Sequence, residues 1–279
     1  MAKPTVYICF LTGLAVFISC WEAASADPHK ITPFLSVQED YSDNILFTEN
    51  NEEEDFITTG TAGVVYTNRT EVVNARLTGS LLHRMYQDND QLDDTDGRIF
   101  GSINYQATER FSWGASAGYR KDTRREVDTT STGLILAGDR KKADGSLSAS
   151  YMVSEITQAS LSLDVMDEEI DDPTTDEDNA SIQAGISLSR NLSERFANTV
   201  GLLNFRYMHY TSEDVGTITT RDYTSDVYQL YGGFSRNITE LTSVYLQVGA
   251  SYTDTSEEAR VSGVTRSDTE DDSWGGVLV

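Results

Sequence analysis

Apolar and polar residues alternate with a period of two through most of the chain after residue 31. From Phe111 to Arg120, one phase carries aromatic residues and alanines, and the other carries serines, glycines and the arginine. The same alternation recurs at 146–153, 158–165, 181–189 and 243–252. Because successive side chains of a β-strand point to opposite faces, the pattern predicts a sheet with one apolar face and one face of small polar residues.

No long segment shows the period of an amphipathic helix, so the predicted fold class is all-β. The alternating segments predict an antiparallel, up-and-down arrangement of about twelve strands. They lie near 31–41, 56–66, 71–86, 97–106, 111–121, 145–153, 156–166, 180–190, 195–210, 223–236, 240–253 and 272–279.

The segment lengths favour a transmembrane β-barrel. They run to about 9–13 residues, longer than the usual strand and close to the 9–11 that cross a bilayer on a tilt. Short connections are predicted at 68–70, 107–110, 154–156, 191–194 and 237–240, and long ones at 42–55, 87–96, 122–144, 167–178, 211–222 and 254–271. Short turns at one end and long loops at the other are typical of outer-membrane barrels. The sheet is expected to close, because an open edge in lipid leaves backbone groups unpaired.

A soluble sandwich or soluble barrel is the alternative, with the apolar face turned inward. Aromatic residues near strand ends favour the membrane interpretation, as candidate interface girdles: Tyr66, Tyr86, Tyr105, Tyr119, Tyr210 and Tyr252.

Residues 1–26 have the features of a cleaved secretory signal peptide, which leaves 27–279 as the barrel. Lys3 precedes a mostly apolar run from Thr5 to Ser19, and Ala24-Ser25-Ala26 offers small residues for cleavage. A transmembrane helix would need about 20 residues, and a lipoprotein cut at Cys20 is a second alternative. Both cysteines, Cys9 and Cys20, fall in this segment, so the mature chain is expected to contain none.

The composition excludes one class of partner. With 21 Lys+Arg against 45 Asp+Glu, the formal net charge is -24, which argues against binding to nucleic acid. The 14 Tyr and 10 Phe argue against a disordered acidic chain.

The polar phase supplies the candidate site residues, which are expected to face the lumen. An arginine facing mid-bilayer lipid would cost about 2–4 kcal/mol, which supports this orientation. Arginine and amide side chains could guide acidic or neutral sugars, or they could pair with acids such as Asp164 and fill the barrel. The candidates are Arg76, Arg84, Arg98, Arg120, Arg206, Gln183, Gln229 and Gln247.

No catalytic, metal or cofactor site is predicted, and the chain is expected not to be an enzyme. His83 and His209 lie in the apolar phase, directed toward the lipid interface, and His29 is near the mature N-terminus. The acidic stretches at 88–96 and 168–178 lack the spacing of an EF-hand and are interpreted as solvated loops.

The last predicted strand, about seven residues ending at Val279, is short for a spanning strand. We therefore expect the sequence to be incomplete at its C-terminus, with further strands beyond.

The start of the mature chain, above all Tyr41-Ser42-Asp43-Asn44-Ile45, resembles the first hairpin of the β-barrel porin-2 type outer-membrane proteins. The resemblance covers about residues 31–82. It implies a location in the outer membrane, contact with outer-membrane lipid and the barrel-assembly machinery, and a role in exopolysaccharide export or at PEP-CTERM loci, with polysaccharide as a partner. The expected function is a porin-like pore or conduit. A non-conducting structural barrel with acidic surface loops and a secreted soluble β-protein are the alternatives.

Overall fold

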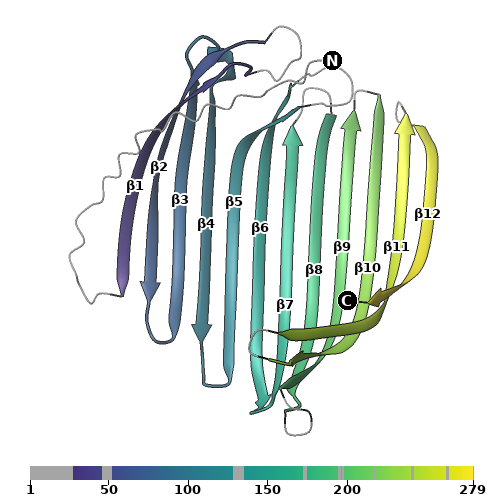
Figure 1. The fold of residues 1–279 in the computed structure, drawn as a ribbon. Coiled ribbons are helices and arrows are strands. Elements are labelled where there is room, and N and C mark those ends of the chain that lie inside the picture. The colour runs from purple at the N-terminus through teal and green to yellow at the C-terminus, as the bar shows by residue number, and fades with distance from the viewer. Residues whose placement is uncertain are drawn as a thin grey trace.

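Twelve strands form one antiparallel sheet in the computed structural model (Figure 1). The structure describes residues 28–45, 52–127, 135–171, 175–193, 196, 198–216, 218–239, 242–261 and 264–278, so the predicted signal peptide lies outside it. A short 3-10 turn, η1 (Asp90–Leu92), precedes β4. The strands are β1 (His29–Ser42), β2 (Asp55–Arg69), β3 (Val73–Tyr86), β4 (Asp94–Gln106), β5 (Phe111–Val127), β6 (Ile135–Ser154), β7 (Thr157–Asp171), β8 (Thr175–Asn191), β9 (Thr199–Gly216), β10 (Thr219–Asn237), β11 (Ser243–Val261) and β12 (Val264–Leu278).

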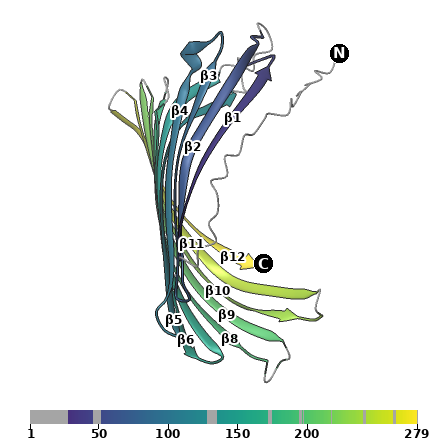
Figure 2. The same ribbon diagram turned by 90° about the vertical axis from the view of Figure 1, so that its left-hand side faces the viewer.

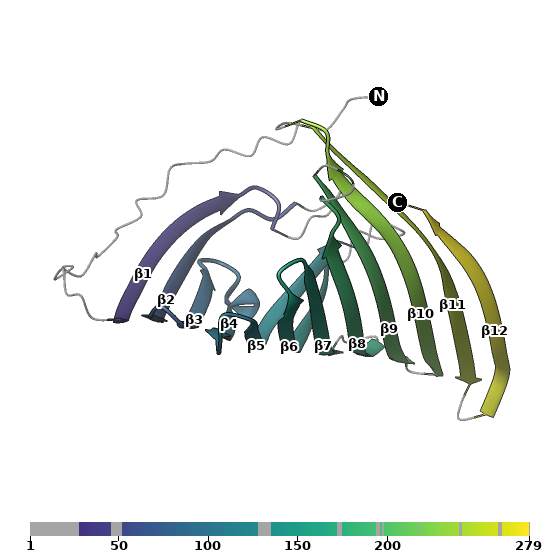
Figure 3. The same cartoon turned by 90° about the horizontal axis from the view of Figure 1, so that it is seen from below.

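Each strand pairs with its neighbours in sequence, which is the strand order of an up-and-down β-barrel. The all-β, antiparallel, up-and-down fold class is therefore confirmed. The sheet bends strongly, as Figures 2 and 3 show, with β1 and β12 at its two edges. Within the described residues no pairing joins β1 to β12.

The strand register keeps the two phases of the sequence on separate faces. Across β5 and β6, Trp113 lies opposite Ala149, whereas Ser116 lies opposite Ser146 on the other face. A shift of one residue would reverse the face of every side chain, so the alternation itself specifies this register.

The apolar face is exposed and covers no second layer. Within the described residues, Ile45, Tyr86 and Ile170 are the only buried hydrophobic side chains, whereas Leu81 is 63% and Trp274 is 76% exposed. A soluble sandwich would bury this face against another sheet, but all twelve strands belong to one sheet. No described helix is long and apolar enough to cross a membrane.

Four of the six predicted long loops are wrong. The ranges 122–144, 167–178, 211–222 and 254–271 consist largely of strand, and the connections after β7, β9 and β11 span only two or three residues. The short connections are confirmed at the opposite end, although the one between β8 and β9 runs from 192 to 198. Strict alternation of short and long connections is therefore wrong.

The predicted short terminal strand is also wrong. β12 has 15 residues and pairs with β11 from Val264 to Leu278. Its first part, 264–271, carries charged and polar residues in both phases, so no apolar alternation marks it in the sequence.

Candidate functional site

All eight candidate residues lie on the polar face of the sheet. Arg98 lies opposite Arg120 across β4 and β5, and Gln229 lies opposite Arg206 across β10 and β9. The register relates the other four to the same phase: Arg76, Arg84, Gln183 and Gln247.

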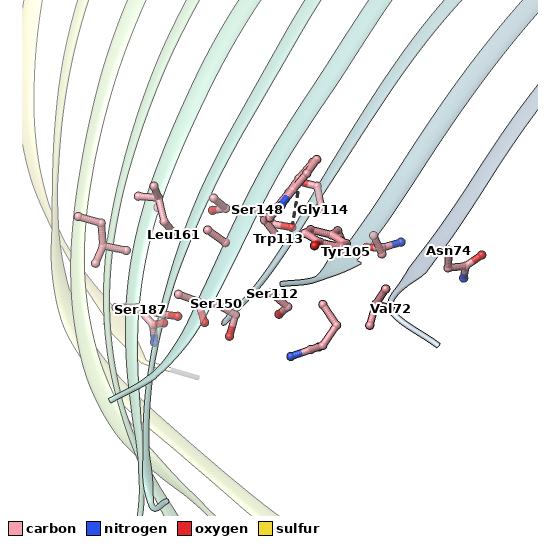
Figure 4. A pocket seen from close by; sticks show the side chains of 18 of the residues that line it. Val72, Asn74, Tyr105, Ser112, Trp113, Gly114, Ser148, Ser150, Leu161 and Ser187 are labelled. Atoms are coloured by element: carbon pink, nitrogen blue, oxygen red, sulfur yellow. Dashed lines mark hydrogen bonds between the residues drawn. The ribbon is translucent and has the colours of Figure 1, made fainter. Parts of the chain in front are cut away.

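The polar face is hollow near the short-turn end of the strands (Figure 4). A cavity of about 630 Å³ touches residues of eight consecutive strands, from β3 to β10. A single cavity can be lined by residues of eight neighbouring strands only if the sheet is concave on that side. The polar face is therefore the inside of the bend. Its polar lining consists mainly of hydroxyl and amide groups, for example Asn74, Asn104, Ser148, Ser160 and Ser187.

A row of ion pairs crosses the same face nearer the opposite end of the strands. We call it the charge belt, and it contains Arg84, Asp94, Asp96, Arg120, Asp122, Arg140, Lys142 and Glu168. Arg84 Nη1 donates to Asp94 Oδ1 and Arg84 Nη2 to Asp96 Oδ2, both at 3.0 Å. Asp96 also accepts the backbone amide of Thr123 at 3.0 Å, which joins β4 to β5.

Asp122 and Glu168 continue the charge belt over β5, β6 and β7. Arg140 donates to both carboxylate oxygens of Asp122, at 2.8 and 2.5 Å. Arg140 and Lys142 also approach Glu168, at 3.7 and 3.5 Å. The hydrogen bond from Arg140 lowers the pKa of Asp122, which keeps this carboxylate charged at neutral pH.

The candidate residues do not form one cluster. Arg84 and Arg120 belong to the charge belt, whereas Arg206 lines the hollow. Arg76 Nε donates to Thr78 Oγ1 at 3.3 Å, and Gln247 is buried at the short-turn end of β11. Asp164, expected as a partner of the arginines, lies opposite Gln183 and Ser146. The acids that pair with arginine in the belt are Asp94, Asp96, Asp122 and Glu168.

Several belt residues escaped the sequence analysis, namely Asp122, Arg140, Lys142 and Glu168. They lie in segments predicted as loops, where both faces of the strands are polar and the apolar alternation disappears. The opposite-charge pairing of Asp122 with Arg140 across a hairpin is the signal that could have revealed these two residues.

Two rows of aromatic side chains border the apolar face. At the end away from the short turns, the rings of Tyr207, Tyr228, Tyr252 and Trp274 follow one another across β9–β12 with centroids 5.0, 6.2 and 4.9 Å apart. The pair Tyr41 and Phe56 extends this upper row to β1 and β2, at 5.0 Å.

The lower row lies near the short turns. It includes Tyr66, the pair Tyr105 and Trp113 at 6.0 Å, and Tyr151. From Phe56 to Tyr66, β2 rises about 33 Å, which is about 25 Å of height at the tilt usual in barrels. This height matches the apolar band of an outer-membrane barrel. Tyr86 and Tyr210 were wrongly included as interface residues, because both lie on the polar face.

The histidines on the apolar face have polar partners. His83 Nδ1 lies 2.9 Å from Thr95 Oγ1. His209 Nδ1 lies 3.0 Å from Asp226 Oδ1, which also accepts the Tyr207 hydroxyl at 2.7 Å. His209 thus has an acidic neighbour, so the absence of enzymatic activity stays a prediction. His29 Nδ1 lies 2.8 Å from the Tyr66 hydroxyl.

At least one acidic residue near the long connections stabilises the structure through hydrogen bonds. Asp55 is 2% exposed and accepts the backbone amide of Asp88 at 3.2 Å and the side-chain amide of Asn89 at 2.9 Å. Among the described residues, no group of three or more acids, histidines or cysteines is arranged to hold a metal ion.

Comparison with known proteins gives a structural likeness alone. No protein-family profile and no curated protein matches this sequence. Among solved structures, the chain is similar to in-vitro folded OmpT, an outer membrane protein of Vibrio cholerae in its trimer form. The identity is 9% and the TM-score 0.37, over 90% of this chain and 97% of the other.

Proposed function

We propose that this protein is an outer-membrane β-barrel that acts as a porin-like pore or conduit. The observation that carries the proposal is the division of one curved sheet into an exposed apolar face, bordered by two aromatic rows, and a hollow polar face. Lipid would cover the first face and water would fill the second. A soluble protein would leave this large apolar surface in water at a high free-energy cost.

Hydrophilic, uncharged solutes suit the lining of the hollow. Hydroxyl and amide groups dominate it, and such groups exchange hydrogen bonds with sugars without a charge penalty. The resemblance of the first hairpin to porin-2 type proteins adds a role in exopolysaccharide export to this proposal.

A non-conducting barrel is the second candidate function, and the charge belt is the observation that favours it. Ion pairs cross the polar face over five strands, from β3 to β7. If the belt meets side chains from the opposite wall, it fills the passage instead of lining it.

Three measurements test these alternatives. Heat-modifiable migration on gels together with outer-membrane fractionation is expected, and a purely soluble, periplasmic protein would contradict the barrel. Single-channel conductance in planar bilayers is expected for the pore, whereas silent insertion would favour the non-conducting barrel.

Adjacent cysteine substitutions test which face borders water. Ser148 lines the hollow, and the adjacent Leu147 lies exposed on the apolar face of the same strand. In a cysteine-free mature chain, a charged thiol reagent should block current through Ser148→Cys and leave Leu147→Cys unchanged. Equal modification of both positions would contradict the proposed orientation.

A further inference from the structure

An apolar groove lies on the exposed face of β2–β5, away from the hollow. It has a volume of about 530 Å³. Its apolar walls include Val64, Leu81, Ile99 and Tyr119, and Lys121 stands at its β5 end. The exposed fractions of Val64, Leu81 and Ile99 are 44%, 63% and 51%, so these walls are free to contact a ligand.

Two glycines create the groove. Gly79 of β3 lies opposite Ile99 of β4, and Gly97 of β4 lies opposite Leu81 of β3. Each glycine, which has no side chain, therefore faces a large apolar residue on the other strand. A Cβ atom built on Gly79 would meet no heavy atom within 4 Å. The floor of the groove is therefore backbone, and the space above it is open.

The groove runs obliquely with respect to the apolar band. At β5 it reaches Tyr119 and Lys121, at the end of the apolar stretch of that strand. At β2 it reaches Ala62 and Val64, several residues inside the band from Phe56. A chain-like apolar ligand would thus run from the interface at Lys121 toward the middle of the band.

The charge at the groove mouth differs from that of the neighbouring surface. Lys121 lies opposite Lys141 across β5 and β6, and both are on the apolar face. Farther along the same register row the residues are acidic, namely Glu169, Asp178, Glu213, Asp222, Glu258 and Asp268. An anionic headgroup is repelled by the acidic row and attracted to the two lysines.

The lysines remain available to a ligand. Lys121 pairs with Asp139 at 3.3 Å and Lys141 with Glu169 at 3.0 Å, and both pairs are substantially exposed. Exposed ion pairs of this kind contribute little to stability, so a phosphate can replace a carboxylate as the partner of the ammonium group.

We propose that this groove binds a phosphorylated acyl lipid, with an acyl chain across Gly97 and Gly79 and the phosphate at Lys121 and Lys141. The inference rests on the proposed outer-membrane location. With the short turns toward the periplasm, the lysines lie at the outer leaflet, so the occupant is a lipid A-type glycolipid.

The test uses the mature protein in nanodiscs of zwitterionic phospholipid doped with lipid A, with bound lipid counted by native mass spectrometry. Gly79→Leu should fill the groove and reduce retained lipid A by about tenfold or more. Gly276→Leu is the matched control, because Gly276 also lies on the apolar face with open space at its Cβ. It should retain lipid A as the unaltered protein does.

A second variant tests the contact between the lipid phosphate and the two lysines. The double variant Lys121→Gln with Lys141→Gln should weaken binding of phosphorylated lipid A and leave binding of dephosphorylated lipid A unchanged. Equal retention by the Gly79→Leu and Gly276→Leu variants would overturn the groove. Equal retention of phosphatidylglycerol would overturn the lipid A assignment. If the mass spectrum shows a protein dimer that the Gly79→Leu variant no longer forms, the occupant of the groove is a second copy of this protein and not a lipid. Failure of the unaltered protein to enter nanodiscs would overturn the membrane proposal itself.

Discussion

Asp55 ties the start of β2 to the connection that follows β3. It is nearly inaccessible to solvent, and its carboxylate accepts hydrogen bonds from Asp88 and Asn89. A buried acceptor that holds several donors is costly to remove, because the donors lose their partner. This one side chain therefore orders the connection between β3 and β4.

We expect Asp55→Ala to loosen that connection. Hydrogen exchange of the Asp88 amide should accelerate on the order of tenfold, whereas Asp90→Ala, at an exposed aspartate of the same turn, should leave it unchanged. An unchanged exchange rate at Asp88 in the Asp55 variant would show that the carboxylate does not order the turn.

The same contact should depend on acid pH. Burial raises the pKa of Asp55, but the hydrogen bonds, first the one from Asn89, outweigh burial and lower the pKa below its ordinary value of 3.8. A lowered pKa contributes stability above the ordinary value and loses it as the pH falls through the folded-state pKa. Protection of the Asp88 amide, corrected for intrinsic exchange, should persist from pH 7 to about 4 and be lost below. Loss of protection between pH 7 and 5 would contradict this assignment.

At the scale of the strands, the charge belt places four cations and four carboxylates on the concave face of β3–β7. Removing one carboxylate leaves an excess of positive charge beside the proposed passage. Glu168 and Glu169 are adjacent in β7 and point to opposite faces, which makes them a matched pair.

Glu168→Gln is expected to shift the reversal potential in a salt gradient toward anion selectivity, and Arg140→Gln toward cation selectivity. Glu169→Gln, on the convex face, should change neither. If Glu168→Gln and Glu169→Gln shift the potential equally, the belt does not line the conduction path.

The strands also show where sequence periodicity succeeds and fails. Within the apolar band, the alternation from Phe111 to Tyr119 specified strand, face and register. Beyond Tyr119, Lys121 and Asp122 are both charged although they lie on opposite faces, so the strand continues without an apolar signal. The predicted strands therefore ended where the apolar alternation ends. The hollow and the apolar groove could not be predicted, because both depend on which residues of different strands become neighbours.

For the whole molecule, the two aromatic rows define a band that should coincide with the bilayer. Of the three tryptophans, Trp21 lies in the predicted signal peptide, so Trp113 in the lower row and Trp274 in the upper row are expected to be the only two in the mature chain. Interface tryptophans sit near the headgroups and not at the bilayer centre.

Single-tryptophan proteins, made with Trp113→Phe or Trp274→Phe, test this arrangement. Both remaining tryptophans should be quenched more strongly by lipids brominated near the headgroup than by lipids brominated near the end of the acyl chain. In the protein with both Trp113→Phe and Trp274→Phe, a tryptophan placed by Leu147→Trp lies midway along the apolar stretch of β6. It should be quenched more strongly by lipids brominated near the end of the acyl chain. Shallow quenching at position 147 would contradict the band.

The strands continue well past the upper aromatic row. From Tyr207 to Gly216, β9 adds nine residues, which is about 30 Å of chain, and the ionic screening length at physiological salt is about 8 Å. Charges at the far ends of the strands therefore lie beyond the screening length of charges at the level of that row, so the two groups of charges interact only weakly.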